Sequence, residues 1–341
     1  MGIVDFPTSF NSSFFIRTFF PGFIASILYS FALAPISFGS SWESLEIEDK
    51  LIIWIVIGMM IGLIINSLDM YIYQFFEGIN WPRKIWRYKY KNIINYFEKI
   101  DKKVKIIDEK IDDVLNNKES VDIDNIELEE LIDEQSKLWA EIRKFPYNLD
   151  KKYYSDRYPE AATIFGNVLC EYESYPEKQY GMHMMVFWQP LWFILPKEIK
   201  EDFDLVAAKA DFIVYLSFVF LTYSFIGGIG FYFQSYTWSN ILNYNIPLYT
   251  IFTFIISIIL CFLFYKISIS NHKNYGRFIK AIFDIYRFDL AKKLKITISY
   301  APNEDEIKKW RQYRNYLLDY IKINDTLNSE KTVENDFYYL V

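Results

Sequence analysis

Long uncharged stretches alternate with charged segments along the chain, and the uncharged stretches predict membrane-spanning helices. Residues 212–265 carry no charge and would form a helix of about 80 Å, too long for one crossing of a hydrocarbon core of about 30 Å. The polar stretch 234–245, followed by Pro247, divides them into two spans. The four expected spans are 19–36, 51–68 with a helical continuation to Gly78, 212–233 and 248–265.

Lysine and arginine collect beside the ends of two of these spans. One basic group follows the second span at 83–91, and another follows the fourth span at 266–280. The loop between the first two spans is acidic at 43–49, and the expected loop between the last two carries no charge. Basic flanks stay on the cytoplasmic side of a membrane. The pattern therefore predicts that both termini and residues 80–210 are cytoplasmic.

A heptad pattern of hydrophobic residues over 90–114 predicts a long amphipathic helix, with Asn80 as its expected N-cap. The pattern stops and then resumes over 128–145, where Asp124 and Glu127 are an expected capping pair. The simplest prediction is a coiled-coil-like cytoplasmic hairpin with about 30 residues in each arm, standing off the membrane. It would serve as a spacer or self-association element, with a partner-binding coil as the alternative.

The segment after the hairpin is predicted to be helical and to lie beneath the membrane. Residues 156–159 are expected to open a helix that ends near Pro176 and Gly181. The uncharged, tryptophan-rich segment 179–196 leaves two interpretations open. It lies at the membrane interface or under the bundle, or it forms a fifth crossing, which would conflict with the basic flank after the fourth span.

The tail carries two more hydrophobic stripes, at 275–286 and 307–321, separated by a turn at 301–303, and both are expected to be packing faces. An amphipathic segment at 197–209 leads into the third span. The predicted fold class is an all-α integral membrane protein with four transmembrane helices, a cytoplasmic helical hairpin and a helical C-terminal tail. Its expected parts are 1–79 with spans one and two, 80–150 with the hairpin, 151–208 with the helical region beneath the membrane, 209–268 with spans three and four, and 269–341 with the tail.

Composition fits a membrane protein with large water-exposed parts. Hydrophobic residues make up 52% of the 341 residues, including 31 Phe, 28 Tyr and 9 Trp, and 23% are charged. The net charge of −6 gives no electrostatic basis for nucleic acid binding. Cys170 and Cys261 lack metal-ligand spacing and are expected to be small buried residues. Asp5 stands where a signal peptide is basic, so no cleavable signal peptide is expected.

Motifs for catalysis are not found. The chain has no Gly-rich phosphate loop, GxSxG, HExxH or zinc spacing, and His183 and His272 have no obvious ligand partners. We therefore expect no catalytic residue, cofactor or metal site, and an enzyme is disfavoured. An enzyme that uses carboxylates of 157–196, such as Glu173, is the least favoured alternative.

Glycines mark the candidate packing positions of the spans. Gly58 and Gly62 share one helix face and allow close approach of a neighbouring helix, either within the subunit or at a subunit interface. Gly227, Gly228 and Gly230 would allow a tight crossing or a bend in the third span.

Two polar residues near the end of the second span are candidates for an ion pathway. Asn66 and Asp69 lie where a carboxylate facing lipid is unfavourable. The simpler interpretation is that Asp69 snorkels to the headgroups or pairs with Arg83 or Lys84. An ion pathway is the alternative.

Proline, glycine and aromatic residues recur over 157–196 in a fixed order. They are Arg157, Pro159, Thr163, Gly166, Asn167, Glu173, Tyr175, Pro176, Tyr180, Gly181, Trp188, Pro190, Trp192 and Pro196. A second group follows in the tail, with the sequence FDIYRFDL at 283–290 and then Pro302, Glu306 and Trp310.

Together the two groups resemble the core and C-terminal pattern of a family of uncharacterised prokaryotic multi-pass membrane proteins. The resemblance covers most of residues 155–310 and leaves out the hairpin. It implies that 157–196 folds as a fixed unit beneath the membrane, and it implies no known activity, cofactor or catalytic residue.

Two hypotheses about function follow. The first is a non-enzymatic protein of the prokaryotic cytoplasmic membrane, homo-oligomeric and surrounded by lipid, which couples a cytoplasmic helical module to its transmembrane bundle as a channel-like or signalling component. The second is a membrane-tethered scaffold that binds a cytosolic protein partner through the hairpin and tail. Neither the permeant ion nor the partner follows from the sequence.

Overall fold

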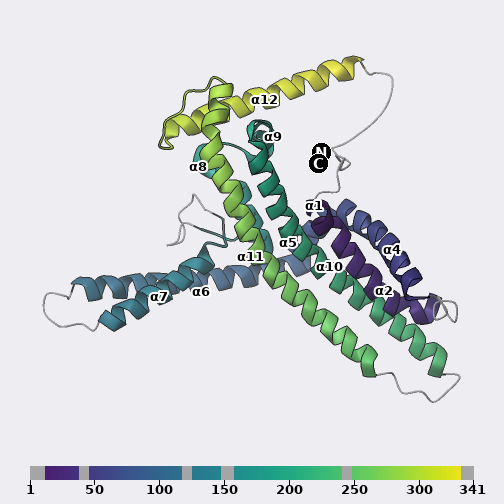
Figure 1. Cartoon of the computed structure of the whole chain (residues 1–341). Coiled ribbons are helices and arrows are strands. Elements are labelled where there is room, and N and C mark those ends of the chain that lie inside the picture. The colour runs from purple at the N-terminus through teal and green to yellow at the C-terminus, as the bar shows by residue number, and fades with distance from the viewer. Residues whose placement is uncertain (1–11, 38–45, 117–124, 147–156, 240–247, 332–341) are drawn as a thin grey trace.

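The computed structural model describes residues 12–37, 46–116, 125–146, 157–239 and 248–331, and every regular element within them is a helix (Figure 1). The elements are α1 (Ser12–Phe14), the π-helical η1 (Phe15–Phe19), α2 (Phe20–Ser37), α4 (Ile47–Ser67), α5 (Asp69–Glu77), α6 (Arg83–Asn116), α7 (Asn125–Ile142), α8 (Ile164–Tyr180), α9 (Met184–Ile194), α10 (Lys197–Ser239), α11 (Leu248–Lys293) and α12 (Glu304–Lys331).

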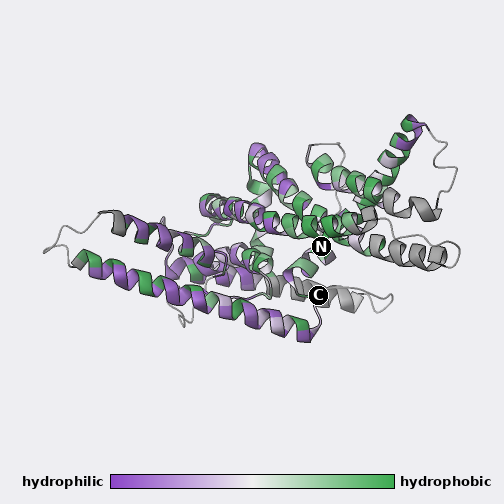
Figure 2. Ribbon diagram, turned by 90° about the horizontal axis from the view of Figure 1, so that it is seen from below, coloured by the Kyte–Doolittle hydropathy of each residue, from purple (hydrophilic) through white to green (hydrophobic). Residues whose placement is uncertain are grey.

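Four helical segments are long and apolar enough to cross a membrane: Ser12–Ser30, Ile47–Ser67, Lys197–Ile226 and Phe252–Lys293. They gather in one bundle, in which α2 packs on α4 and α10, and α10 packs on α11. Figure 2 shows hydrophobic residues along this bundle, whereas α6 alternates between hydrophobic and hydrophilic residues. The predicted all-helical fold with four candidate spans is confirmed.

The first span begins earlier than predicted, at Ser12 instead of residue 19, and it therefore includes Arg17. Pro21 has no N–H to donate to the Arg17 carbonyl, so a regular α-helix cannot form there. The chain passes this point as a π-helix, in which the Phe20 N–H donates to the Phe15 carbonyl. The proline thus lies within a continuous helical path, and the π segment accommodates it.

The second span continues toward Gly78 as predicted, but with a break. Leu68, at φ −92° and ψ 7°, separates α4 from α5. Gly78 ends α5 in the left-handed conformation, at φ 85°, which a residue without a Cβ adopts without strain. The break lets α5 take its own direction into the polar half of the molecule.

The two long helices α10 and α11 extend well beyond the bundle. They contain 43 and 46 residues, which correspond to about 65 and 70 Å of helix against a hydrocarbon core of about 30 Å. The amphipathic segment 197–209 is therefore the start of α10, and the stripe at 275–286 belongs to α11 instead of a separate helix. The predicted hinge at 234–245 is helical up to Ser239, and its remainder lies outside the described residues.

The predicted hairpin corresponds to α6 and α7, which pack against each other and project sideways from the bundle (Figure 1). Their shared core consists of Phe97, Ile100, Val104, Ile142 and Phe145. Two expectations were wrong: α7 has only 18 residues, and Asn80 donates to the Gln74 side chain instead of capping α6, which begins at Arg83. The predicted pair of Asp124 with Glu127 lies partly outside the described residues.

A second layer consists of α8, α9 and α12 at the opposite end of α10 and α11 from α2 and α4, with α8 and α9 packed on α11 (Figure 1). The helix expected to open at 156–159 begins later, at Ile164, because the Thr163 hydroxyl caps it by accepting from the Gly166 N–H. Pro176 lies inside α8, and Gly181 ends it in the left-handed conformation. The short α9, with 11 residues, is no fifth span; Phe187 and Leu191 on it are buried in the core.

Close contact between α2 and α4 depends on three glycines. A Cβ added to Gly62 would overlap the Thr18 carbonyl oxygen, and one added to Gly22 would overlap backbone atoms of Gly58 and Gly62. A Cβ on Gly58 would lie 2.8 Å from the Phe23 Cα. The backbones therefore touch with nothing between them, as in small-residue crossings of membrane helices.

Replacing Gly62 by alanine should separate α2 from α4. We expect Gly62→Ala to lower stability by about 1–3 kcal/mol through overpacking, although alanine is the better helix former. Thermal unfolding of the detergent-solubilised protein, followed by circular dichroism, measures the effect. Val56→Ala on the exposed side of α4 is the matched control. Equal unfolding temperatures for the two variants would contradict the described contact.

Candidate functional site

A cluster of ionisable side chains, most of them partly buried, lies where η1, α5, α10 and α11 meet. Arg17 of η1 forms an ion pair with Asp211 of α10, with Nε and Oδ2 2.6 Å apart. The Arg17 Nη1 atom is also 3.9 Å from Asp204 Oδ1, and Asp204 lies about two helical turns before Asp211 on α10. Charged groups in such a position are unfavourable in lipid and mark functional sites by default. We call these residues, with the tyrosines and histidine described next, the polar network.

Tyr73 connects the ion pair to a histidine on the last of the four elements. Its hydroxyl lies 2.5 Å from Asp211 Oδ1 and 2.8 Å from His272 Nε2. His272 is fully buried, and its Nδ1 lies 2.9 Å from the Ser268 carbonyl oxygen. A continuous hydrogen-bonded path therefore joins Arg17 to the backbone of α11.

The geometry fixes how many protons this path holds. A carbonyl oxygen only accepts, so His272 Nδ1 must carry a proton and donate to Ser268. The Tyr73 hydroxyl has one proton for two neighbours, Asp211 and His272. Its second hydrogen bond must therefore receive a proton from one of those neighbours.

Two arrangements satisfy both hydrogen bonds of Tyr73. In the neutral one, protonated Asp211 would donate to Tyr73, which would donate to His272 Nε2. This reverses the described hydrogen bond from Tyr73 to Asp211 and leaves Arg17 without the charge of that carboxylate. In the ionised one, the His272 imidazolium donates to Tyr73, which donates to the Asp211 carboxylate. Both hold the same number of protons, and a concerted shift of two protons converts one into the other. The Tyr73 hydroxyl thus connects the Asp211 carboxylate with the His272 ring through two hydrogen bonds.

Asp69, one of the two polar residues singled out from the sequence, belongs to the same cluster. Its carboxylate accepts a hydrogen bond of 2.7 Å from Tyr215, which is almost fully buried on α10. The described contacts thus pair Asp69 with Tyr215 instead of Arg83 or Lys84. Asn66, the other candidate, is exposed on α4 and makes no contact with the network among the described residues.

The candidate glycines divide into two groups. Gly58 and Gly62 contact η1 and α2 of the same chain, which is the packing interpretation, and a contact between subunits stays a prediction. Gly227, Gly228 and Gly230 lie on the backbone of α10, in a part where side-chain surroundings are outside the described residues.

The first part of the motif-like group at 157–196 fixes the junction of α5 with α8. Thr163 donates to the carbonyls of Phe76 and Glu77, and a Cβ on Gly166 would lie 2.9 Å from the Glu77 carbonyl oxygen. The fully buried Asn167 side chain accepts from two backbone N–H groups and donates to two carbonyls within 160–163. Pro159, buried beside it, accepts through its carbonyl from Tyr90 of α6.

The second part meets the tail group in space. Tyr175 and Tyr180 both donate to Asp284 of α11, at 2.9 and 2.7 Å. The buried pair of Arg287 with Glu306 lies beside them, with the Arg287 guanidinium 4.2 Å from the Tyr180 ring centre. Gly181 allows close contact with Ile307 of α12, because a Cβ there would overlap the Ile307 carbonyl. Residues a hundred positions apart therefore form one structural unit.

The third part is an aromatic layer on α9. The ring centre of Trp188 lies 5.0 Å from that of Phe203 and 6.1 Å from that of Phe283. The Trp192 ring also packs on Phe203, at 5.5 Å, and lies 6.0 Å from Trp188. Pro190 lies inside α9, and the exposed Pro196 stands just before α10. These side chains pack α9 against α10 and α11, so their role in the described structure is structural.

The carboxylates of this unit pair with basic side chains or face one another. The described residues contain no group of three or more His, Cys, Asp or Glu side chains placed to hold a metal ion. Arg157 and Lys280 share the Glu171 carboxylate. Glu173 faces Glu77, and the partial loss of water around its carboxyl group, together with repulsion from Glu77, raises its pKa to about 7.

Comparison of the chain with protein-family models, with curated proteins and with solved structures gave no match. The resemblance to a prokaryotic family stays a prediction, and the geometry of the residues carries the functional inference.

The sequence pointed to Asp69 but missed the rest of the polar network. Neither Arg17 nor Asp211 was singled out from the sequence, and His272 was described as a histidine with no obvious ligand partners. The missed signal is that a base and an acid stand at the same predicted side of two different spans. Charged side chains within membrane helices usually pair with one another, so an acid and a base at the same depth are expected to be in contact.

The raised pKa of Glu173 predicts that the stability of the folded protein depends on pH. The folded protein holds the Glu173 proton more tightly than the unfolded chain, so this group lowers stability as pH rises from about 4.5 to about 7. We expect Glu173→Gln to be more stable than wild type at pH 8 and indistinguishable at pH 4. Because Glu173 is exposed to solvent, screening keeps the difference small.

Chemical unfolding of the two proteins at both pH values measures this difference, with Glu129→Gln on exposed α7 as the control for loss of one charge. A variant that is less stable than wild type at pH 8 would show that the carboxylate makes a favourable contact instead.

Proposed function

We propose that this chain is a non-enzymatic, homo-oligomeric integral membrane protein of the prokaryotic cytoplasmic membrane that acts as a proton-responsive channel-like or signalling component. In this proposal the polar network senses protons and couples the transmembrane bundle to the cytoplasmic hairpin. The observation that carries it is the hydrogen-bonded path from Arg17 through Asp211 and Tyr73 to His272. The residues of this path lie on four elements, η1, α10, α5 and α11. A change in protonation would therefore change contacts between these elements.

Charge supports a response to protons. The network holds three carboxylates and one arginine, so negative charge is in excess unless a proton or another cation is present. The titratable and charged groups that face Asp211 come from five elements: Arg17 of η1, Asp69 and Tyr73 of α5, Tyr172 of α8, Asp204 and Tyr215 of α10, and His272 and Tyr275 of α11.

Loss of one proton has a definite structural consequence. The two hydrogen bonds of Tyr73 need two protons, and a single remaining proton serves only one of them. At high pH, Tyr73 of α5 must therefore release either Asp211 of α10 or His272 of α11. We propose that this release loosens α5, and α5 leads directly into α6 of the hairpin.

Tyr73→Phe tests this mechanism because it removes one hydroxyl and keeps the ring. We expect wild-type protein in liposomes to change its ion flux during a titration between about pH 5 and pH 8, and Tyr73→Phe to lose that pH response. Spin labels on Glu109→Cys of α6 and Lys292→Cys of α11 report the accompanying movement of the hairpin. The control is Tyr71→Phe, an exposed tyrosine on the same helix.

If wild type shows no pH response in either flux or label distance, or if Tyr73→Phe responds as wild type does, the proposed function is wrong. A Tyr73→Phe protein that fails to fold is recognised by its circular dichroism. The ion flux and the label distance of this variant are compared with those of wild type only when its helicity matches that of wild type.

A scaffold that binds a cytosolic partner is the second candidate. Its supporting observation is the exposed apolar surface of the hairpin, where Tyr88, Ile106 and Leu115 of α6 are 65%, 51% and 48% exposed and Ile132 of α7 is 47% exposed. Tyr88 and Ile106 lie on the same face of α6, since 18 residues make five helical turns, and exposed apolar side chains on one face can contact a partner.

Removing the distal hairpin separates the two candidates. The core residues Phe97, Ile142 and Phe145 must stay, since the Phe145 carbonyl accepts from Arg157. Replacing 106–136 with a short Gly-Ser linker meets this condition. A scaffold should lose its crosslinked cytosolic partner in cells, whereas a pore should keep its ion flux in liposomes. Loss of flux together with an unchanged set of crosslinked proteins would contradict both assignments.

A further inference from the structure

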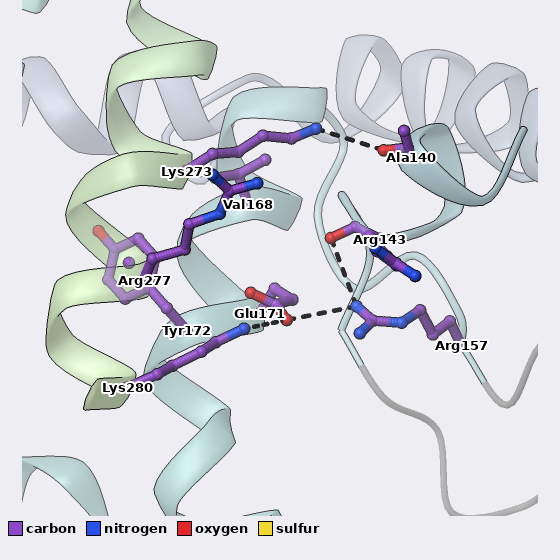
Figure 3. A pocket seen from close by; sticks show the side chains of 10 residues that line it. Ala140, Arg143, Arg157, Val168, Glu171, Tyr172, Lys273, Arg277 and Lys280 are labelled. Atoms are coloured by element: carbon purple, nitrogen blue, oxygen red, sulfur yellow. Dashed lines mark hydrogen bonds and ion pairs between the residues drawn. The ribbon is translucent and has the colours of Figure 1, made fainter. Parts of the chain in front are cut away.

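A cavity of about 230 Å³ lies between the end of α7, α8 and the middle of α11. Five basic side chains line it, and a single carboxylate, Glu171, faces them. The basic residues are Arg143, Arg157, Lys273, Arg277 and Lys280. Figure 3 shows them converging from opposite sides, with Lys273, Arg277 and Lys280 on α11 and with Arg143 and Arg157 across the cavity.

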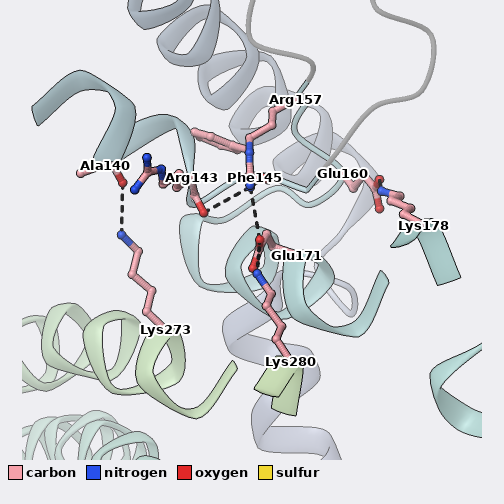
Figure 4. A network of polar contacts seen from close by, with 9 residues as sticks. All are labelled: Ala140, Arg143, Phe145, Arg157, Glu160, Glu171, Lys178, Lys273 and Lys280. Carbon is pink, nitrogen blue, oxygen red and sulfur yellow. Dashed lines mark hydrogen bonds and ion pairs between the residues drawn. The ribbon is translucent and has the colours of Figure 1, made fainter. Parts of the chain in front are cut away.

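The one carboxylate is already used. Arg157 Nη1 lies 3.3 Å from Glu171 Oε1, and Lys280 pairs with the same oxygen (Figure 4). Arg157 also donates to the carbonyls of Arg143 and Phe145. Because the side chains of Arg157 and Glu171 are only 8% and 10% exposed, this part is a rigid, buried wall.

Three cations remain without a carboxylate partner among the described residues. Lys273 donates to the Ala140 carbonyl at 3.3 Å, which is a neutral acceptor, and no described residue pairs with the guanidinium of Arg143 or Arg277. Arg277 and Lys144 repel the charge of Lys273, and Glu141, the nearest other carboxylate, is bound to Lys144 and Tyr96. Like charges are thus held together by the fold.

We propose that this cavity binds a phosphate group, carried either by an anionic phospholipid headgroup or by a soluble phosphorylated molecule. Two arginines present planar forks of N–H donors that suit the oxygens of a phosphate, and a doubly charged anion offsets the unpaired cations. A water molecule takes up about 30 Å³, so the cavity accommodates a phosphate with several waters. Basic pockets beside transmembrane helices are suited to lipid headgroups.

The bound phosphate would connect two parts of the molecule. Arg143 follows α7, and Arg277 lies on α11, so an anion between them fastens the hairpin to the helix that carries His272. Binding can be measured without any assay of ion flux, so its failure and the failure of the proposed function are separate results.

The test compares two probes on the full-length, purified protein. Pyrophosphate is titrated against protein in detergent, and phosphatidic acid is titrated in nanodiscs of phosphatidylcholine, with pure phosphatidylcholine nanodiscs as the blank. The variant is Arg143→Gln with Arg277→Gln, two exposed side chains that contribute no described ion pair. The control is Lys292→Gln with Arg311→Gln, which removes the same charge from exposed positions outside the cavity.

We expect binding of at least one probe to weaken about tenfold or more in the cavity variant and less than twofold in the control. Binding of pyrophosphate in detergent identifies a soluble source, and binding of phosphatidic acid alone identifies a lipid source. Binding of neither probe to wild type, or equal weakening in the cavity variant and the control, would overturn the proposal. Matching circular dichroism spectra establish that the variants are folded.

Discussion

The continuity of α10 and α11 is the constraint on which the rest of the structure depends. A helix in lipid must satisfy every backbone group internally, and these two helices keep that pattern from the apolar bundle into the polar half without a break. They pack along each other, α2 rests on one, and α8 and α9 rest on the other. Whatever shifts one end of this pair therefore shifts the layer at its other end.

The buried ionisable groups lie where this pair leaves the uncharged stretch. Asp211 immediately precedes the uncharged run of α10, and His272 lies two turns beyond the run of α11. Burial of such groups is unfavourable unless they are paired and hydrogen-bonded. Arg17 and Tyr73 provide those partners, from the middle of η1 and the middle of α5. The packing of η1, α5, α10 and α11 thus provides the hydrogen-bond and ion-pair partners of Asp211 and His272.

Hydropathy and heptad spacing were enough to predict four spans and the first arm of the hairpin, because both signals are local. Other features of the fold depend on contacts between residues far apart in the sequence, and local patterns do not reveal these contacts. The start of α8 depends on Thr163 and on the four backbone partners of Asn167, and the early start of the first span depends on the π segment before Pro21. Asp69 was recognisable as a carboxylate near the end of a span, but its partner Tyr215 is 146 residues away, and no spacing rule reaches that far.

The two candidate sites share one helix, and this limits how they can influence each other. His272 and Lys273 are adjacent on α11, so one faces the polar network and the other faces the basic cavity. A ligand shifts a conformational equilibrium only by the difference in its affinity for the two states. An anion in the cavity can thus affect the network only if α11 moves relative to α7 when Tyr73 releases a partner. By reciprocity, protonation would then alter anion affinity by the same factor.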